Sequence, residues 1–433
     1  MPRRRTYDPL RVMLNHRLVG HLAKEPDGAL RFQYAEEWLD GRLGMPVSLS
    51  LPLREDAYRG EAVAAVFDNL LPDGDLRRRV AERVGAAGED AYSLLREIGG
   101  DCVGALRFLP EGVDTEVDFT RLEGDRLSDR EIEKMLGGLA QAPLGLDREG
   151  DFRISVAGAQ EKTALLWHEG QWIKPRGVTP TTHILKKQIG SLPNGIDLSH
   201  SVENEYLCLK LLAAFGLRVN EAEMVSFGKM RALVVRRFDR IWIEGKLFRL
   251  PQEDLCQALS IPPSRKYQND GGPGMVDILG VLRGSDTAAE DQRTFLMAQV
   301  LFWLIGATDG HAKNFSIFLG EEGSFRLTPI YDVISAQPSL DAHQIHAKQM
   351  KLAMFVGDKR HYTMRYICGR HFQQTVQRAG LPRSLATEVL HEVTSRAEAA
   401  ISAVEDGLPR RFPAVLVESI SRGLRGRLQS IQA

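Results

Sequence analysis

Cysteine is scarce in this chain, and the four cysteines lie far apart. The 433 residues contain only Cys102, Cys208, Cys256 and Cys368. They form no Cys-x-x-Cys motif and no Cys/His pair at the spacing of zinc ligands. This pattern argues against a disulfide framework and indicates a protein of the reducing cytoplasm without a structural metal.

The chain also lacks a long hydrophobic run and an excess of either charge. Its longest apolar stretch, 295–307, is too short to span a bilayer and contains Gln299. The basic N-terminus has no apolar core of signal-peptide length. Lys plus Arg total 56 against 57 Asp plus Glu, so no overall field attracts nucleic acid or a membrane. We therefore expect a cytoplasmic protein with no membrane partner.

The length of the chain and the changes in its pattern of apolar and charged residues predict more than one domain. A chain of 433 residues is about two or three times the usual domain length. Residues 1–110 begin with the apolar alternation of strands and continue with helical spacing that Pro72 interrupts. Residues 111–150 are rich in Asp, Glu and Gly, although 129–140 could form a helix. We predict a β-rich subdomain at 1–110, a connecting segment at 111–150 and a domain at 151–433.

The predicted domain changes from strand patterns to helical patterns. The segment "RISVAGAQEKTALLWH" (153–168) alternates on both sides of "AGAQEK", which predicts a hairpin. Short strands and a meander follow as far as about 250, with one helix predicted at 203–217. The patterns after about 285 are mostly helical. The predicted fold class is α+β and bilobal, with a β-rich N-lobe at about 151–250 and an all-helical C-lobe at about 251–433.

The segment "ATDGHAKN" (307–314) places polar residues at the end of an apolar stretch. The helix predicted for 290–306 is apolar nearly all round and should be buried. Beyond it, "FSIFLG" and "SFRLTPI" flank "EEG" as a hairpin that ends near Asp332. The hairpin brings Asp332 back beside Asp309 and Asn314, so three oxygen-bearing side chains should converge.

Phosphoryl transfer requires such a set of side chains. In protein kinases a catalytic-loop Asp accepts the hydroxyl proton, an Asn later in the same loop binds one Mg²⁺, and a second Asp holds the other. Asp309 and Asn314 have the separation of that loop, and Mg²⁺ prefers carboxylate and amide oxygens. The alternative is that Asp309 and Asn314 only cap and shape an ordinary turn, where both residue types are common.

Upstream residues could complete a nucleotide site. The turn of "SVAGAQEK" could place backbone N–H groups over phosphates, although it is neither a Walker motif nor Gly-x-Gly-x-x-Gly. A plain hairpin turn is the alternative. Lys186 in "THILKK", followed by Glu205 on the next predicted helix, has the order of the kinase lysine and its ion-pairing glutamate. Taken alone, each of these two residues is more often a solvated surface charge.

Ordered sequence blocks carry a resemblance to a known family. The chain contains, in this order, "FRISVAGAQEKTALL", "PTTHILK", "VENEY", "RLPQED", "KYQNDGGPG", "LIGATDGHAKNFSIF" and "RLTPIYDVIS". These blocks resemble the HipA family, the kinase toxins of HipBA toxin–antitoxin pairs. Because "YAEEWL", "VFDNLLPDG" and "EIGGDCVGAL" resemble the N-terminal region of that family, the resemblance covers nearly the full length. It implies a serine/threonine protein kinase with a bilobal protein-kinase-like fold and an additional N-terminal β-rich subdomain.

The resemblance also implies roles for single residues. Asp309 would be the catalytic base, and Asn314 and Asp332 would bind Mg²⁺. Lys186 would contact the phosphates of ATP, with Lys187 as a competitor, because strand alternation lets only one of the two face the nucleotide. Further ATP contacts are implied for Val156, Ala157, Gly158, Ala159, Gln160, Glu161, Lys162, Glu205, Arg236, Arg237, Phe238, His311, Asn314 and Asp332.

Ser155 matches the autophosphorylated serine of the family. A phosphoserine adds about −1.5 to −2 charges beside a loop that must approach the phosphates of ATP. We therefore expect autophosphorylation to switch the enzyme off, and the alternative is a strand serine with a solvated hydroxyl.

For His311 we expect hydrogen bonds that hold the loop rather than proton transfer.

The resemblance implies substrates and partners as well. The substrates of the family are aminoacyl-tRNA synthetases, notably glutamyl-tRNA synthetase, whose phosphorylation stalls translation and promotes dormancy and persistence. The partner is a HipB-like helix-turn-helix antitoxin that binds operator DNA. Arginines at 3–5, 77–79 and 422–427 could contact DNA phosphates, although solvated faces are the simpler interpretation. Two alternatives remain: a kinase for a small hydroxyl substrate or lipid, and a co-repressor that binds ATP without turnover.

Overall fold

The computed structural model describes residues 7–41, 44–113, 121–146 and 152–431. Their internal contacts divide the chain into two compact units. Unit 1 consists of residues 1–187, 225–264 and 316–325, and unit 2 consists of residues 188–224, 265–315 and 326–433. The chain passes between the units several times, so neither unit is a single stretch of sequence.

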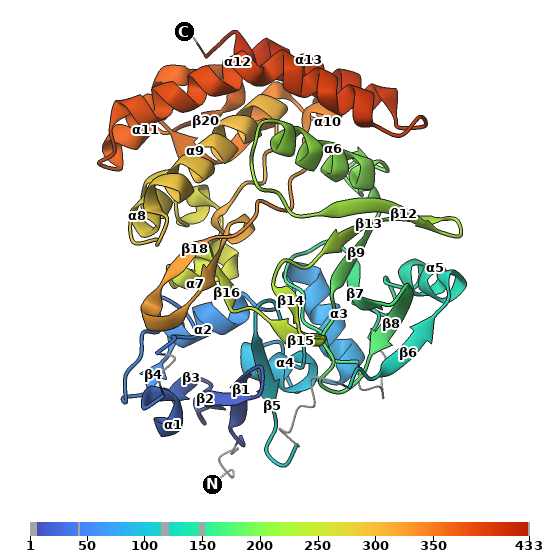
Figure 1. The fold of residues 1–433 in the computed structure, drawn as a ribbon, viewed down its shortest axis with the longest axis vertical. Coiled ribbons are helices and arrows are strands. Elements are labelled where there is room, and N and C mark those ends of the chain that lie inside the picture. The colour runs from blue at the N-terminus through green and yellow to red at the C-terminus, as the bar shows by residue number, and fades with distance from the viewer. Residues whose placement is uncertain (1–6, 42–43, 114–120, 147–151, 432–433) are drawn as a thin grey trace. The chain divides into compact units, whose positions relative to one another are not determined.

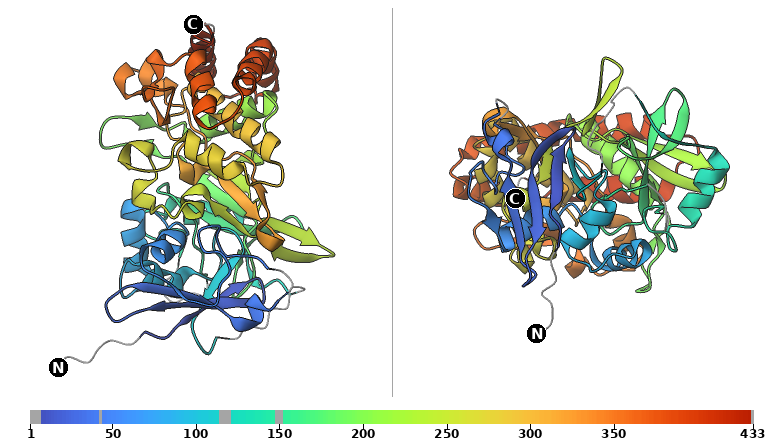
Figure 2. Two further views of the ribbon diagram at one scale, coloured as in Figure 1. Left: turned by 90° about the vertical axis from the view of Figure 1, so that its left-hand side faces the viewer. Right: turned by 90° about the horizontal axis from the view of Figure 1, so that it is seen from below.

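A five-stranded antiparallel sheet opens unit 1 (Figure 1; blue to cyan in Figure 2). Its core-facing side chains include Val12, Phe32 and Phe108, and Phe67 packs edge-on against both phenylalanine rings. The strand order is β4-β3-β2-β1-β5, with β1 (Leu10–Leu14), β2 (Arg17–Lys24), β3 (Leu30–Tyr34), β4 (Tyr58–Arg59) and β5 (Leu106–Leu109). The helices of this region are α1 (Glu36–Leu39), α2 (Glu61–Asp68), α3 (Gly74–Val84) and α4 (Ala91–Ile98).

Unit 1 also contains most of a six-stranded sheet, in the order β12-β13-β9-β7-β8-β6. Its strands are β6 (Gly124–Leu127), β7 (Lys162–His168), β8 (Gln171–Pro175), β9 (His183–Lys187), β12 (Ala222–Phe227) and β13 (Met230–Arg236). Helix α5 (Asp129–Gly137) buries Ile132 and Leu136 against Leu165 and Leu185 of the sheet. The segment that we interpreted as a connection thus supplies one strand and one helix.

Short strands and helices complete unit 1. The predicted meander is confirmed only as two hairpins, β12–β13 and β14 (Arg240–Ile243)–β15 (Lys246–Arg249). It is wrong as one continuous sheet, because β13 pairs with β9 on its other side and β14–β15 form a sheet of their own. The predicted hairpin after α9 is confirmed as well, since β17 (Ser316–Leu319) and β18 (Phe325–Leu327) are neighbours beside β16 (Gln252–Asp254). Helix α7 (Leu255–Ala258) follows β16 directly.

Helices dominate unit 2. They are α6 (Ser201–Ala214), α8 (Met275–Leu282), α9 (Ala288–Ile305), α10 (Gln337–Asp341), α11 (Gly369–Arg378), α12 (Arg383–Gly407) and α13 (Ala414–Leu428). The predicted buried helix is confirmed, because α9 is buried throughout 295–305 and both α12 and α13 pack against it (Figure 1). None of the helices in the described part of the chain is long and apolar enough to cross a membrane.

The expectation of an all-helical C-lobe at about 251–433 is wrong, because this range contains the three-stranded sheet β16-β17-β18 and the hairpin in which β19 (Lys351–Val356) pairs with β20 (His361–Thr363). Unit 2 also contains a hairpin before this range, in which β10 (Gly190–Ser191) pairs with β11 (Asp197–Leu198). The short 3₁₀ helices of the chain are η1 (Pro263–Arg265), η2 (Gln268–Asp270), η3 (Ala312–Asn314), η4 (Glu321–Gly323), η5 (Ala347–Gln349) and η6 (Met364–Tyr366).

The hairpin predicted for 153–168 is wrong in its first arm. Ile154 forms a parallel bridge with Asp101, and Gly158 forms another with Pro72. The residues before the turn therefore pair with the N-terminal region and not with β7. Alternation of apolar residues predicts that both arms are extended strands, but it does not predict with which strand each arm pairs.

Candidate functional site

The loop that follows α9 is fixed against the buried face of that helix. Gly306 ends α9 with φ at 75°, the left-handed conformation that glycine adopts most easily. A Cβ atom on Gly310 would lie 2.4 Å from the ring of Phe302. The chain can pass this closely only because both positions are glycine, and η3 begins directly beyond the loop at Ala312.

Asp309 and Asn314 are joined by hydrogen bonds within this loop. The side-chain nitrogen of Asn314 donates to the backbone carbonyl of Asp309 at 2.7 Å, and the backbone N–H of His311 donates to the same carbonyl at 2.9 Å. Because the amide nitrogen is occupied, Oδ1 of Asn314 is the side-chain atom left for a ligand. The side chain of Asp309 is 57% exposed, so its carboxylate can meet an incoming group.

Asp332 lies on a segment that runs beside the loop. Ala307 and Ser335 form an antiparallel bridge, and the hydroxyl of Tyr331 donates to the carbonyl of Lys313 at 3.1 Å. The backbone of Asp332 has φ at 58°, a strained conformation for a residue other than glycine. Such strain is concentrated at functional sites. The segment of Asp332 thus runs beside the loop of Asp309 and Asn314 within unit 2, and the convergence of the three side chains stays a prediction.

His311 is buried beside both carboxylates. Burial lowers the pKa of His311, and the negative charges of Asp309 and Asp332 oppose this shift. Nδ1 of its ring has no hydrogen-bond partner among the described residues, and Nε2 lies 3.8 Å from the carboxylate of Asp309. His311 holds the loop through two backbone hydrogen bonds. Its N–H donates to the carbonyl of Asp309, and its carbonyl accepts from the N–H of Asn314, each at 2.9 Å.

Tyr267 is a member of this site that sequence reasoning missed. Its hydroxyl donates a hydrogen bond to Oδ1 of Asp309, and its ring meets the ring of His311 edge to face at 4.9 Å. Tyr267 precedes Asp309 by 42 residues. No spacing or periodicity marks a single tyrosine at that distance, so only the folded structure reveals the contact.

The predicted phosphate loop, residues 156–162, lies in unit 1. Gly158 has φ at 104°, and its carbonyl accepts from the N–H of Asp73 at 3.2 Å. The ammonium of Lys162 donates to the carbonyl of Ala157. Val156 and Lys162 are buried, Ala159 is exposed, and Ala157, Gly158, Gln160 and Glu161 are half-buried. The loop is thus held partly by its own lysine and partly by the residue that precedes α3.

Glu161 forms an ion pair with Lys187, the second lysine of β9. Its carboxylate binds Nζ of Lys187 at 2.5 Å and Nη1 of Arg79 at 3.0 Å. Burial opposes ionisation of Glu161, but these two cations outweigh it, and the pKa of the carboxyl is lowered. Alternation along β9 places Lys186 on the opposite face of the strand from Lys187, and Lys186 is buried.

Ser155 is fully buried next to this loop. Its hydroxyl donates to the carbonyl of Leu70 at 2.7 Å, and its N–H donates to the carbonyl of Asp101 at 3.0 Å. The alternative of a strand serine with a solvated hydroxyl is therefore wrong. A phosphate group on Ser155 would remove the donor that binds Leu70 and add charge in a buried place, so the segment would have to leave its position.

The other predicted ATP contacts belong to the end of β13, to the residues directly after it and to α6. The backbone N–H of Arg237 donates to the carbonyl of Thr182 at 2.8 Å, so this N–H already has an acceptor within the fold. Phe238 packs edge-on against Phe318, and Arg236 is exposed at the end of β13. Glu205 is buried on α6, in unit 2.

Arg237 belongs to a buried ionic cluster that sequence reasoning also missed. Asp101 accepts from Arg240 at 2.9 Å, Arg249 at 2.8 Å and Arg237 at 3.3 Å. Asp239 accepts from Arg237 at 2.8 Å and lies 3.0 Å from Arg240. Burial raises the pKa of Asp239, but Arg237 and Arg240 outweigh burial and hold this pKa at about 2. The pKa of Asp101 is likewise well below its usual range, because the three arginines outweigh its burial.

The arginine clusters are engaged within the chain. Arg77 pairs with Asp68, Arg78 with Asp75 and Arg79 with Glu161. Near the C-terminus, Arg422 pairs with Asp341, Arg425 pairs with Glu398, and Arg427 donates to the carbonyl of Leu304. Residues 3–5 lie outside the described residues. Each arginine of the two described clusters thus has a partner within the chain.

No group of three or more His, Cys, Asp and Glu side chains is arranged to hold a metal ion in the described part of the chain. The predicted magnesium site does not need three such side chains. Asn314 and Asp332 would supply two ligands, and phosphates and water would supply the others. Oδ1 of Asn314 and the carboxylate of Asp332 are oxygen donors that suit Mg²⁺. All four cysteines are buried and free of disulfides.

Comparisons with known proteins agree with the resemblance seen in the sequence. The model of the HipA N-terminal domain matches residues 10–109, and that of the HipA-like C-terminal domain matches residues 154–401. The putative kinase Y4mE of Sinorhizobium fredii is 32% identical and covers 98% of this chain and 98% of its own length. The serine/threonine-protein kinase toxin HipA of Shewanella oneidensis is 28% identical over 92% of this chain and 90% of its own length.

A solved structure supports the fold. HipA of Shewanella oneidensis MR-1, in a complex with HipB and its operator DNA, matches with a TM-score of 0.80 at 23% identity. The match covers 98% of this chain and 97% of the other. The chain therefore shares the fold of a HipA kinase over nearly its whole length, which confirms the predicted fold class.

Proposed function

Because the chain belongs to the HipA family of serine/threonine protein kinases, we propose that it is the kinase toxin of a toxin–antitoxin pair. Both domains of the family are present, and the kinase toxin of Shewanella oneidensis is similar over nearly the whole chain. The proposed reaction transfers the γ-phosphoryl group of ATP to a serine or threonine hydroxyl of a protein.

In this proposal Asp309 is the general base. Its exposed carboxylate accepts the proton of the acceptor hydroxyl while the hydroxyl oxygen bonds to the γ-phosphorus. The bond from that phosphorus to the bridging oxygen of ADP breaks, and ADP leaves with the electron pair. The observation that carries the proposal is the 2.7 Å bond from Asn314 to the carbonyl of Asp309, because it fixes a ligand oxygen beside the base.

Asn314 and Asp332 hold Mg²⁺ in this proposal, and Lys186 contacts the phosphates of ATP. Bound Mg²⁺ neutralises charge on the β- and γ-phosphates. The strained backbone of Asp332 supports a fixed ligand position. The loop 156–162 supplies backbone N–H groups to the nucleotide, and its fixed position against Asp73 supports this role.

The proposed substrate is an aminoacyl-tRNA synthetase, with glutamyl-tRNA synthetase first among the candidates. Its phosphorylation would stall translation and promote dormancy. The proposed partner is a HipB-like antitoxin, through which the chain would assemble on operator DNA. The similar HipA of Shewanella oneidensis was solved together with HipB and its operator DNA, which supports these two partners.

Autophosphorylation of Ser155 is the first test of the proposal. Purified protein should gain one phosphate on Ser155 after incubation with Mg²⁺ and ATP, as mapped by mass spectrometry, and Ser155→Ala should gain none at this position. The variant Ser155→Asp should bind ATP more weakly than Ser155→Ala, because only aspartate adds negative charge where the hydroxyl meets Leu70. Unchanged ATP affinity in Ser155→Asp would contradict the switch.

A protein that binds ATP but gains no phosphate at any residue would count against the kinase toxin. Such a result would favour the co-repressor that binds ATP without turnover. Phosphorylation of a small hydroxyl compound or lipid in preference to proteins would favour the other alternative. Phosphorylated synthetase, measured with the antitoxin absent, would support the proposed substrate class directly.

The two lysines of β9 should differ sharply in their effects. Lys186→Met should lower kcat/KM for ATP by about 10²- to 10³-fold, since it removes a cation from the phosphates. Lys187→Met breaks the ion pair with Glu161, a partly buried contact whose loss should lower kcat/KM by less than about fivefold. Steady-state kinetics on both variants tests this assignment. Equal losses in the two variants, or a larger loss in Lys187→Met, would reverse it.

A further inference from the structure

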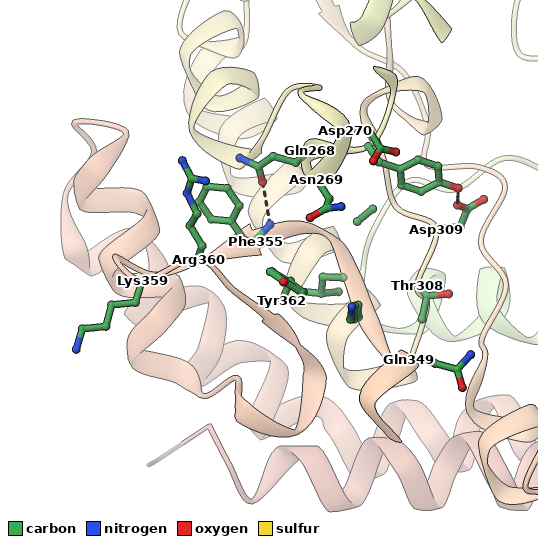
Figure 3. A pocket seen from close by; sticks show the side chains of 14 residues that line it. Gln268, Asn269, Asp270, Thr308, Asp309, Gln349, Phe355, Lys359, Arg360 and Tyr362 are labelled. Carbon is green, nitrogen blue, oxygen red and sulfur yellow. Dashed lines mark hydrogen bonds between the residues drawn. The ribbon is translucent and has the colours of Figure 1, made fainter. Parts of the chain in front are cut away.

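A pocket of about 690 Å³ lies beside Asp309 in unit 2. One wall is η2 together with the loop at Thr308 and Asp309, and the other wall is the β19–β20 hairpin (Figure 3). The N–H of Phe355 donates to the side-chain oxygen of Gln268 at 2.9 Å, which ties the two walls together. The lining residues that the argument uses are Tyr267, Asp270, Lys351, Lys359, Arg360 and Tyr362.

A hydroxyl group already reaches the proposed base from this pocket. Tyr267 lines the pocket, and its hydroxyl donates to Oδ1 of Asp309. A serine or threonine hydroxyl must make the same kind of bond before it loses its proton. The phenol of Tyr267 therefore marks the direction from which an acceptor side chain would approach Asp309.

The hairpin wall carries three cations. Lys351, Lys359 and Arg360 are exposed, and none of them forms an ion pair with any residue that the structure describes. Lys351 lies over the ring of Tyr362 at 5.2 Å, and Arg360 lies over the ring of Phe355 at 5.4 Å. These ring contacts hold the side chains in place while their charge stays available to a partner.

The three cations lie at different positions along the β19–β20 hairpin. Lys351 begins β19, whereas Lys359 and Arg360 occupy the turn after it, and Figure 3 shows both of the latter at the end away from Asp309. A strand of six residues spans about 20 Å, so an extended peptide with its hydroxyl at Asp309 could place neighbouring side chains along these cations. The acid on the opposite wall, Asp270, would repel a second negative charge there and favours contact with the hairpin.

From this geometry, and on the basis of the proposed kinase function, we propose that the pocket binds the acceptor segment of the protein substrate and selects acidic residues near the phosphorylated hydroxyl. The hydroxyl displaces Tyr267 from Asp309, and aspartate or glutamate side chains within about five residues of it bind Lys351, Lys359 and Arg360. The occupant is an acidic peptide segment, because the proposed reaction requires a protein hydroxyl at Asp309 and the hairpin wall offers three cations to acidic side chains near that hydroxyl.

Matched peptides test this selection. Three peptides would share one serine and differ only in flanking residues: glutamate and aspartate, glutamine and asparagine, or lysine. The acidic peptide should have a kcat/KM about tenfold above that of the neutral peptide, chiefly through KM, and the lysine peptide should be the poorest substrate. Fluorescence anisotropy of labelled peptides measures binding independently of turnover and should give the same order.

A variant with reversed charges on the β19–β20 hairpin tests the role of its cations. The double variant Lys359→Glu and Arg360→Glu should lose the acidic preference and bind the lysine peptide more tightly than the wild type does. Lys246→Glu, which reverses an exposed lysine at the start of β15 in another hairpin, should leave the preference unchanged. Both positions of the double variant are exposed, so the fold should survive, and an unchanged melting temperature would verify this.

Some outcomes would overturn the inference without touching the kinase function. Equal binding of acidic and neutral peptides, or an acidic preference that survives the double variant, would overturn it while autophosphorylation of Ser155 persists. Tighter binding of a single-stranded RNA than of the acidic peptide at the same pocket would also overturn it. Loss of autophosphorylation in the wild type, with acidic peptides still bound selectively, would instead contradict the proposed function alone.

Discussion

Asp309→Asn should lower the rate of phosphate transfer by about 10²- to 10⁴-fold while the protein stays folded. Asparagine has nearly the same shape as aspartate but cannot accept the proton of the acceptor hydroxyl at neutral pH. The side chain of Asp309 is more than half exposed, and the bonds that fix the loop go to its backbone carbonyl. The loop should therefore keep its shape in the variant, and the loss should appear in kcat.

The measurement is the initial rate of Ser155 autophosphorylation, followed by mass spectrometry at saturating ATP. Asp406→Asn is a matched control, because it makes the same substitution at an exposed position near the end of α12. Its rate should equal that of the wild type, and the melting temperatures of all three proteins should agree. A rate in Asp309→Asn within a factor of about three of the wild type would remove Asp309 from the role of base.

Much of this site could be predicted because its pieces are local in sequence. Asp309 and Asn314 stand in one loop, and the glycines that let the loop leave α9 lie in the same stretch. The apolar character of α9 and the turn before β18 are patterns of periodicity and turn chemistry, which act over a few residues. The same reason explains why the hairpin turns after β12 and after β14 were predicted correctly, whereas the pairing of β13 with β9 was not.

The features that sequence reasoning missed depend on contacts between distant residues. The segment before the phosphate loop pairs with Asp101 and Pro72 and not with its neighbour β7. Tyr267 reaches Asp309 only through the fold. Charged residues are usually exposed, so a sequence alone gives no reason to bury Asp101 and Asp239 among three arginines. In each case the partner is chosen by packing, which local patterns do not encode.

Asp101→Asn should have the largest effect on stability of any single substitution considered. Asp101 binds Arg237, Arg240 and Arg249, and all four side chains are at most 4% exposed. Asparagine can still accept a hydrogen bond, but it carries no charge, so the buried arginines lose one of their two carboxylates. Removing one partner of a buried ionic group typically costs about 3–5 kcal/mol in the free energy of unfolding.

Denaturant unfolding monitored by tryptophan fluorescence tests this expectation at pH 7. The control is Asp125→Asn, which breaks a half-exposed pair with Arg176 in the same unit. A surface pair of this kind contributes at most about 1 kcal/mol, so the control should unfold near the midpoint of the wild type. If both variants unfold together, the buried cluster does not stabilise unit 1 as its geometry suggests.

The pH dependence of this difference gives a second test of the same cluster. The pKa of Asp101 is depressed in the folded state, so its stabilising effect is complete above the unfolded value of about 4 and declines as pH falls toward the folded value. The advantage of the wild type over Asp101→Asn should therefore be constant between about pH 5 and 8 and should shrink by about 1.4 kcal/mol per pH unit below about pH 4. An advantage that stays constant down to about pH 2 would mean that the charge of Asp101 is not what holds the arginines.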